Sequence, residues 1–312
     1  MVRKPILPST PPVSSYASMR QPVLADAQRD VSKTIDTVIK TLRKQFGAEA
    51  VSRLDEYDSD PVDTFPSGLT SLDTALGIGG FPLSKLVQIA GPESVGKSTL
   101  CKKLIREAQA HGIAPYFIDG EDSRDTPHRY RALGITPQNI AWSDALTIED
   151  AFSLADAAIL SFRKLDKPAM IFLDSIAAFL NEGDETRGYD EEGRRGAKAA
   201  FLSKNLKKLL DKIRGTQIGM VFVNQIREKA NAAPFEDPTY EPGGRALRHY
   251  SHVVLRMKRM GKIRKGAQDV GIKSRVNVKK SKLSPPYRNA DIAIYFDGRI
   301  ENLDGTSEGD EE

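Results

Sequence analysis

Residues 91–98 read Gly-Pro-Glu-Ser-Val-Gly-Lys-Ser, a full match to the phosphate-binding loop pattern GxxxxGK[ST]. An apolar run at 86–90 precedes this loop, and apolar residues at helical spacing follow it. The glycines let backbone amides turn toward a β-phosphate, and the positive end of the helix favours the same charge. Strand, loop and helix in this order predict an α/β fold that binds a nucleotide. The expected nucleotide-binding residues are Gly91, Pro92, Glu93, Ser94, Val95, Gly96, Lys97, Ser98 and Thr99.

The loop also predicts the cofactors, ATP and Mg²⁺. Lys97 is expected to reach the β- and γ-phosphates, and the hydroxyl of Ser98 is expected to ligate the metal. The apolar run 169–173 ends at Asp174. A carboxylate at that strand end orients magnesium through its bound waters, so Asp174 is the second expected metal residue.

Two further strands end in polar side chains. Glu121 follows the run 116–118, where a carboxylate could activate the attacking water. Taken singly, Glu121 or the nearby Asp119 fits a helix N-cap or a surface acid equally well. The run 220–223 leads to Gln225, an amide that could sense a γ-phosphate by hydrogen bonding. Because ligands bind at the carboxyl ends of parallel strands, these strand ends are expected to converge on the loop. The side chains there are expected to catalyse the hydrolysis of ATP.

The remainder of the core alternates strand-like and helical stretches. Helical spacing at 100–110, 148–160 and 197–213 separates the early apolar runs. This alternation predicts a mostly parallel twisted sheet with helices on both faces. Later runs have no long helices between them, so the sheet is expected to finish with antiparallel strands. The runs are 86–90, 116–118, 169–173, 220–223, 253–257, 276–278 and 292–296.

Composition divides the chain into four parts. Residues 1–28 are rich in Pro, Ser and Ala and are predicted to be disordered. Residues 29–62 hold an amphipathic helix that ends at Gly47 and then a polar, acidic linker. Because one helix cannot form a core, its apolar stripe must pack on the main body or on another chain. Residues 63–300 form the predicted core, and residues 301–312 form an acidic tail.

The charge distribution is uneven. Residues 245–288 hold fourteen Lys or Arg side chains against the single acid Asp269, which favours a surface for a polyanion over a merely solvated face. No apolar run is long enough for a membrane span, and prolines interrupt the N-terminal segment, so neither a membrane anchor nor a secretory signal is expected. A single cysteine, Cys101, excludes an intrachain disulfide framework and fits a cytoplasmic protein.

The motifs and their neighbours resemble the RecA recombinase family from about residue 44 to residue 297. The matching segments are Lys44-Gln45-Phe46-Gly47, Ser67-Gly68-Leu69-Thr70-Ser71-Leu72-Asp73, Ala75-Leu76-Gly77-Ile78-Gly79-Gly80, Gly91-Pro92-Glu93-Ser94, Phe117-Ile118-Asp119, Leu173-Asp174-Ser175-Ile176-Ala177-Ala178, Asn224-Gln225-Ile226-Arg227, Gly243-Gly244-Arg245-Ala246-Leu247 and Arg275-Val276-Asn277-Val278-Lys279-Lys280-Ser281-Lys282. The resemblance implies a RecA-type ATPase core with an N-terminal helix that docks on the adjacent protomer. The chain ends soon after the core, which resembles a compact, phage-like member without the usual C-terminal domain.

The resemblance also implies roles for residues around the nucleotide. Glu121 resembles the catalytic base and Gln225 the γ-phosphate sensor. Lys280 and Lys282 match a lysine pair that a neighbouring protomer places on the ATP phosphates, where trans cations stabilise transition-state charge. With Lys97, these residues form the expected catalytic set. Asp125 and Tyr130 fall where the family contacts adenine.

Two polar segments match the DNA-binding loops of the family, residues 181–195 and 227–244. Basic side chains there would contact phosphates, giving sequence-independent binding that salt weakens. For any single residue, a solvated surface position is an equally good explanation, and Phe235 fits a loop anchor as well as a base-stacking aromatic. The expected DNA-binding residues are Arg194, Arg195, Lys198, Lys207, Arg227, Lys229, Phe235, Gly243, Gly244, Arg245 and Arg248.

By resemblance, the function is that of a DNA recombinase, a DNA-dependent ATPase that forms filaments on single-stranded DNA and exchanges strands with a homologous duplex. Other expected partners are copies of the chain itself, single-strand-binding proteins and loader proteins; no membrane partner is expected. The alternatives are a motor or branch-migration ATPase and an accessory paralogue without strand exchange. A branch-migration protein would carry a four-cysteine zinc finger, and a paralogue would usually lack Lys97, Glu121 or the paired lysines, all of which are present.

Overall fold

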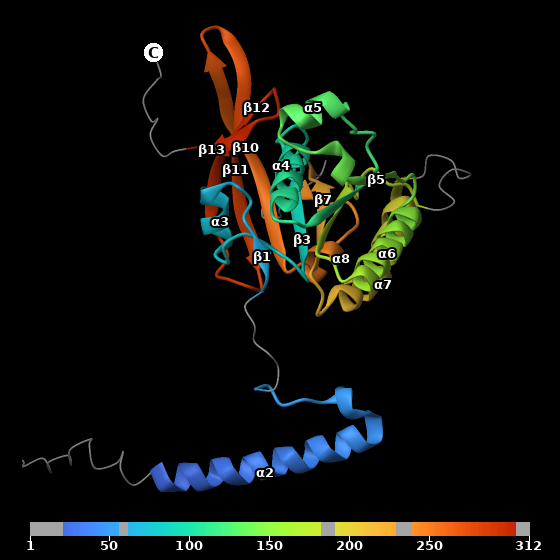
Figure 1. Ribbon diagram of the computed structural model, residues 1–312, viewed down its shortest axis with the longest axis vertical. Helices are drawn as coiled ribbons and strands as arrows, with labels where there is room; N and C mark the ends of the chain where they lie inside the picture. The colour runs from blue at the N-terminus through green and yellow to red at the C-terminus, as the bar shows by residue number, and fades with distance from the viewer. Residues whose placement is uncertain (1–20, 56–61, 182–190, 229–238, 304–312) are drawn as a thin grey trace, which may run out of the picture. The chain divides into compact units, whose positions relative to one another are not determined.

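The computed structural model describes residues 21–55, 62–181, 191–228 and 239–303 (Figure 1). The chain divides into two units, Met1–Pro61 and Val62–Glu312. Among the described residues, no helix has both the length and the hydrophobicity that crossing a bilayer requires.

The first unit is dominated by helix α2 (Gln21–Phe46), which is followed by a short 3₁₀ turn, η1 (Ala48–Ala50). The helix ends as predicted at Gly47, whose φ of 101° lies in a region that glycine adopts without strain. It begins earlier than predicted, so residues 21–28 are helical rather than disordered. Pro22 lies in the first turn, where its missing amide hydrogen removes no helical hydrogen bond, and helix-forming residues follow it.

The second unit contains a nine-stranded sheet in the order β13-β12-β11-β10-β3-β7-β6-β4-β5. The six strands from β10 to β5 run parallel, whereas β10, β11, β12 and β13 pair in antiparallel fashion. The predicted mostly parallel sheet with an antiparallel end is therefore confirmed. The strands are β3 (Leu86–Gly91), β4 (Ala114–Asp119), β5 (Ala141–Asp144), β6 (Ala169–Asp174), β7 (Ile218–Gln225), β10 (Val253–Lys265), β11 (Gln268–Ser281), β12 (Asn289–Tyr295) and β13 (Ile300–Asn302).

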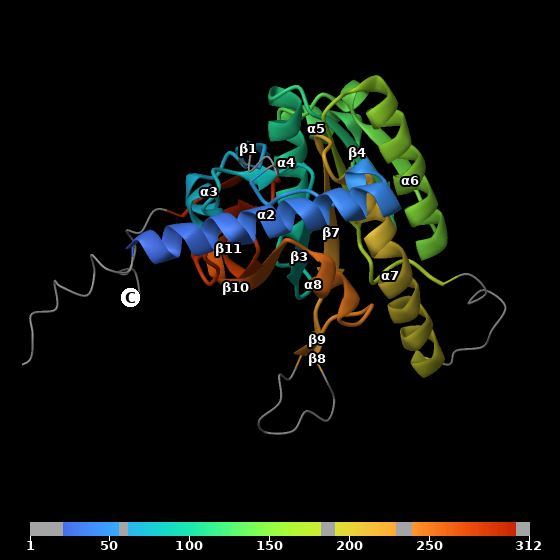
Figure 2. The same cartoon turned by 90° about the horizontal axis from the view of Figure 1, so that it is seen from below.

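Helices cover both faces of the sheet (Figure 2). On one face α4 (Lys97–Ala110) packs with α3 (Thr70–Leu76) and α5 (Pro127–Ala132) over a core that includes Val87 and Ile89. On the other, α6 (Ile148–Leu165), α7 (Glu191–Ile213) and α8 (Ala246–Tyr250) pack over Leu86. Alternate residues of β3 thus enter opposite cores, as its pleat requires. Smaller elements are β1 (Thr64–Phe65), β2 (Phe81–Pro82), β8 (Arg227–Glu228), β9 (Thr239–Tyr240) and η2 (Pro137–Asn139).

The structure corrects several predicted boundaries. Strands β10 and β11 are much longer than predicted and form a hairpin that projects beyond the rest of the sheet (Figure 1). Its outer part is polar on both sides, so the sequence lacks the apolar alternation that marks a strand. Helix α7 begins at Glu191, so residues 191–195 are helical rather than part of the first loop. Strand β13 includes residues 301 and 302, which were assigned to the acidic tail.

Candidate functional site

The phosphate-binding loop joins the central strand β3 to α4 with a backbone that few residues other than glycine can adopt. Gly96 has a φ of 93°, and a Cβ atom there would lie 2.2 Å from Cδ1 of Ile294. A Cβ on Gly91 would lie 2.9 Å from the carbonyl oxygen of Met257. Gly91 is therefore favoured by its close approach to the backbone of β10 and Gly96 by its positive φ, in addition to the phosphate that both are expected to hold.

Lys97 is the first residue of α4 and is almost fully buried. Its ammonium donates to the carbonyl oxygen of Pro92 at 2.7 Å, inside the loop it belongs to. Burial lowers the pKa of Lys97, and the carboxylates of Asp174 and Glu121 oppose that effect. The ammonium of Lys97 therefore lies inside the loop, near the carboxylates of Asp174 and Glu121.

Asp174 and Ser98 fit a magnesium site. Asp174 ends β6, is 1% exposed, and accepts a hydrogen bond from Ser98. Burial raises the pKa of Asp174 to about 6, and its Oδ2 atom has no hydrogen-bond partner among the described residues. A buried carboxylate oxygen without a donor is costly, and a hard cation with oxygen ligands satisfies it. Asp174 and Ser98 are thus the residues that would hold Mg²⁺.

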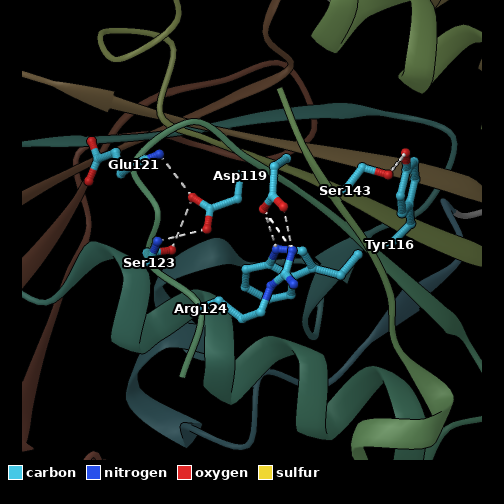
Figure 3. Close-up of polar contacts among 8 residues, drawn as sticks. Tyr116, Asp119, Glu121, Ser123, Arg124 and Ser143 are labelled. Atoms are coloured by element: carbon cyan, nitrogen blue, oxygen red, sulfur yellow. Dashed lines mark hydrogen bonds and ion pairs between the residues drawn. The ribbon is translucent and has the colours of Figure 1, made fainter. Parts of the chain in front are cut away.

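The backbone around Glu121 is fixed by Asp119, the last residue of β4 (Figure 3). The buried carboxylate of Asp119 accepts hydrogen bonds from the amides of Glu121 at 2.9 Å and Ser123 at 2.7 Å. Farther along the loop, Arg124 donates both to Oδ1 of Asp144, at 2.7 Å, and to its Oδ2, at 2.6 Å, so it ties the loop to β5. Asp119 therefore acts as a turn-forming residue, and the Glu121 carboxylate points away from it.

The side chain of Glu121 accepts hydrogen bonds from two other strand ends. Gln225, at the end of β7, donates from Nε2 to Oε1 of Glu121 at 2.9 Å. The hydroxyl of Ser175, just after β6, donates to the same oxygen. The predicted convergence of three strand ends is therefore present. Ser175 was not predicted as a site residue, although it directly follows Asp174 in the sequence.

The two residues expected at the adenine lie in different environments. Asp125 lines a pocket of about 420 Å³ together with Thr99, Arg129 and Tyr295. Tyr130 does not line it: the ring is buried in the core, where burial raises its pKa to about 12. The pocket begins at the phosphate-binding loop, since Ser94 and Gly96 also line it. Its position beside the loop is compatible with the base end of a nucleotide, and its lining includes Tyr295 and Arg129, which the sequence does not predict there.

Lys280 lies on β11, in the antiparallel half of the sheet, and Lys282 directly follows the end of that strand at Ser281. The Lys280 ammonium donates to the carbonyl oxygens of Arg248 at 2.7 Å and His249 at 2.8 Å, at the C-terminal end of α8. Burial lowers the pKa of Lys280. Within the described residues, no hydrogen bond joins either lysine to the phosphate-binding loop of its own chain. This placement leaves their expected role on a neighbouring nucleotide as a prediction.

The expected DNA-binding residues are only partly described. Lys229 and Phe235 lie outside the described residues, and for Arg194 and Arg195 only the helical backbone is described. Lys198 donates to the carbonyl oxygens of Ile176, at 3.2 Å, and Phe179, so its ammonium is engaged by the protein itself. The exposed members of the set are Lys207 on α7, Arg227 on β8, Gly244 and Arg245 just before α8, and Arg248 within α8, whereas Gly243 is buried.

The fold and the site together define a class of protein. A complete phosphate-binding loop on the central parallel strand, with acidic and amide side chains at the neighbouring strand ends, is the arrangement of a P-loop nucleotide-binding protein with an α/β core. The comparison with known proteins narrows this class further.

The model of the RecA N-terminal domain family matches residues 33–301. Protein RecA of Acholeplasma laidlawii is 37% identical over 264 residues, which cover 85% of this chain and 78% of the relative. Protein RecA of Thermus thermophilus is 37% identical over 85% of this chain and 76% of its own length. Protein RecA of Clostridium acetobutylicum is 37% identical over 86% of this chain and 75% of its own length. This chain belongs to the RecA family, as the sequence motifs predict.

Proposed function

We propose that this chain is an ATP-dependent DNA recombinase that forms filaments on single-stranded DNA and catalyses homologous pairing and strand exchange with DNA-stimulated ATP hydrolysis. The observation that carries the proposal is the position of Gln225. This residue ends β7, donates to Glu121 at 2.9 Å, and lies two residues before the second polar segment, 227–244. A change in that segment on DNA binding would reach the hydrolytic carboxylate through one side chain.

In the proposed reaction, the oxygen of a water attacks the γ-phosphorus while Glu121 accepts the proton. The bond between the γ-phosphorus and the β–γ bridging oxygen breaks, and ADP and phosphate leave. Ser98 and Asp174 would hold the magnesium ion that neutralises charge on the phosphates, and Lys97 would bind the same oxygens. The short distance between Gln225 and Glu121 supports a sensor that acts directly on the base.

Assembly would complete the site. Lys280 and Lys282 of one protomer would add positive charge to the nucleotide of the next, and residues 29–62 would dock the two protomers together. Exposed arginines at 227, 245 and 248 would contact DNA phosphates without reading sequence, since homology is read by base pairing. Single-strand-binding and loader proteins of the cytoplasm would be further partners.

The test is ATP turnover with and without single-stranded DNA across a series of salt concentrations, with Lys97→Ala as the control that should lose turnover under every condition. Stimulation by DNA that weakens as salt rises is the expected result. Turnover that ignores DNA would contradict the proposal and indicate a motor or regulator. Bound ATP without any turnover would contradict it in favour of an accessory paralogue.

A further inference from the structure

A buried amide lies in the middle of the central strand. Gln88 is the third residue of β3, is fully buried, and pairs in register with Phe222 of β7 and Val254 of β10. The other side chains of this strand are apolar. Burying an amide donor without a partner is unfavourable, so the Nε2 group of a glutamine at this position needs a specific hydrogen bond.

The partner of Gln88 is Glu241, which follows β9. Nε2 of Gln88 donates to Oε2 of Glu241 at 2.6 Å, a short hydrogen bond to a charged acceptor. Strand alternation places Gln88 on the same face as Leu86, which packs in one core cluster with Leu247 of α8. The pair therefore joins the strand that ends in the phosphate-binding loop to the segment that leads into α8.

Residues 241–250, which we call the return limb, comprise the last residues of the second polar segment and helix α8, and they lead the chain back to the sheet. The limb is fixed at two further points. Nδ2 of Asn224 donates to the carbonyl oxygen of Pro242 at 3.0 Å. Gly243 packs so closely on α7 that a Cβ there would lie 2.5 Å from Cδ1 of Leu202. The Gln88–Glu241 hydrogen bond adds a polar contact between this limb and β3 to the apolar packing of Leu247.

Both ends of the second polar segment thus meet the same strand. On the outgoing side, the amide of Ile226 donates to the carbonyl oxygen of Gly91 at 3.1 Å. On the return side, Glu241 is bound to Gln88, three residues earlier in β3. The far end of the return limb holds Lys280 through the carbonyl oxygens of Arg248 and His249. One short limb therefore contacts both the phosphate-loop strand and a lysine of the expected trans pair.

We propose that Gln88 and Glu241 are positioning residues whose hydrogen bond holds the return limb against β3, so that DNA bound to the second polar segment changes ATP turnover. This inference rests on the proposed function, because it requires DNA stimulation. Neither side chain touches the nucleotide site, so the pair acts through the limb and α8. Losing the bond should lower kcat on DNA while leaving the KM for ATP and the DNA-free turnover unchanged within about two-fold.

Reversing the pair gives the sharpest test. Gln88→Glu places two carboxylates in contact and should reduce DNA-stimulated turnover to within two-fold of the DNA-free rate. The double variant Gln88→Glu/Glu241→Gln rebuilds an amide–carboxylate bond with the opposite polarity and should recover at least half of the stimulation. Gln88→Leu removes the donor without adding charge and should behave like Gln88→Glu, provided circular dichroism shows both variants folded.

Hydrogen exchange in the DNA-free protein tests the limb without relying on activity. The amides of His249 and Ser251 donate to the carbonyl oxygens of Arg245 and Leu247. If the Gln88–Glu241 pair holds the limb, these amides should exchange at least tenfold faster in Gln88→Leu and regain protection in the double variant. Stimulation within two-fold of the parent in both single variants, or a double variant no better than Gln88→Glu, would overturn the inference. If the parent protein showed no DNA stimulation, the proposed function would be overturned together with the inferred coupling. If hydrogen exchange were unchanged in Gln88→Leu, the inference that the pair holds the return limb would fail independently of the proposed function.

Discussion

The Glu121 carboxylate accepts hydrogen bonds from Ser175 and Gln225, side chains that follow or end two different strands. The two donors hold the carboxylate in one orientation. If Gln225 turned toward a γ-phosphate, it would leave the Glu121 carboxylate with one donor fewer. The same amide could thus sense the nucleotide and release the base, which links two roles that the sequence assigns separately.

Glu121→Gln should lower the rate of ATP hydrolysis by about 10²–10⁴-fold, the usual contribution of a general base. ATP and DNA binding should persist, and DNA should be released slowly because release depends on hydrolysis. Single-turnover hydrolysis and DNA dissociation measure the two effects. The matched control is Asp122→Asn, an exposed neighbour whose φ of 52° asparagine also tolerates. Similar losses in both variants would argue against Glu121 as the base.

The pKa of Asp174 predicts a pH effect on the metal-free protein. Burial raises that pKa from 3.8 to about 6, so the folded state binds the proton more tightly than the unfolded chain. The stability that this group contributes is fully present below pH 3.8 and is lost as pH rises through 6. Asp174→Asn, which cannot ionise, should therefore be more stable than the parent at pH 8, by up to about 3 kcal/mol, and similar to it at pH 4.

Denaturant unfolding at pH 4, 6 and 8, without nucleotide or magnesium, measures this difference. Adding Mg²⁺ and ATP at pH 8 should stabilise the parent but not Asp174→Asn, since the variant has lost a metal ligand. A stability difference that does not change with pH would show that the Asp174 carboxyl is already ionised in the folded protein at pH 4. That result would contradict the raised pKa of Asp174 on which the proposed cost of its buried, unbonded oxygen in the absence of a cation depends.

At the scale of elements, the β10–β11 hairpin extends the sheet with a strongly basic surface. Among its side chains, Lys258 and Lys265 are exposed, whereas Lys262 is paired with Asp269 at 2.5 Å. Changing Lys258 and Lys265 to Gln should weaken DNA binding and reduce its dependence on salt, because each lost phosphate contact lowers the logarithmic salt slope by about 0.7 for single strands. DNA-free ATP turnover should stay the same.

Salt titrations of DNA affinity measure this slope. The matched control removes two exposed lysines at the end of α6 and just beyond it, Lys164→Gln and Lys167→Gln, which leaves the same net charge. If both double variants lost the same affinity, the effect would come from net charge alone and the hairpin would have no specific part in DNA binding.

The elements also show which features the sequence could predict. The phosphate-binding loop, Asp174, Glu121 and Gln225 were predictable because each follows an apolar strand and such strand ends meet at one sheet edge. Two contacts were not predictable: the hydrogen bond from Ser175 to Glu121 and the hydrogen bonds from Lys280 to carbonyl oxygens of α8. Both depend on packing between distant segments, which no local sequence pattern encodes. Strand β5 and the outer hairpin were missed or shortened because their residues are largely exposed on both faces.

For the whole molecule, the residues with proposed catalytic roles are distributed between the two halves of the sheet. The parallel half, β3 to β5, carries the phosphate-binding loop and the carboxylates. The antiparallel half, β10 to β13, carries Lys280, Lys282 and the basic hairpin. Residues that would act on a protomer's own nucleotide thus lie in one half, and the lysines proposed to act on a neighbour's lie in the other. If the lysines act in this way, such a division would make turnover depend on assembly.

Helix α2 provides the test of assembly. Val31, Ile35 and Val38 lie on one stripe and are 62%, 44% and 47% exposed, respectively. Burying each in a partner would contribute about 1.5–3 kcal/mol, so changing all three to Ser should abolish self-association. The helix itself should persist, because these side chains support little packing within their own unit. ATP should still bind, whereas DNA-stimulated turnover should fall to the DNA-free rate.

Sedimentation velocity with ATP and single-stranded DNA measures assembly, and circular dichroism checks the helix. The matched control changes Thr34, Thr37 and Thr41 to Ala, since these hydroxyls bond only to carbonyl oxygens of the same helix, one turn earlier. This control should assemble like the parent because alanine favours the helix and leaves the apolar stripe intact. If the serine variant sediments as large complexes and keeps its DNA stimulation, the apolar stripe of α2 is not the docking surface, and the interface must lie elsewhere in the chain.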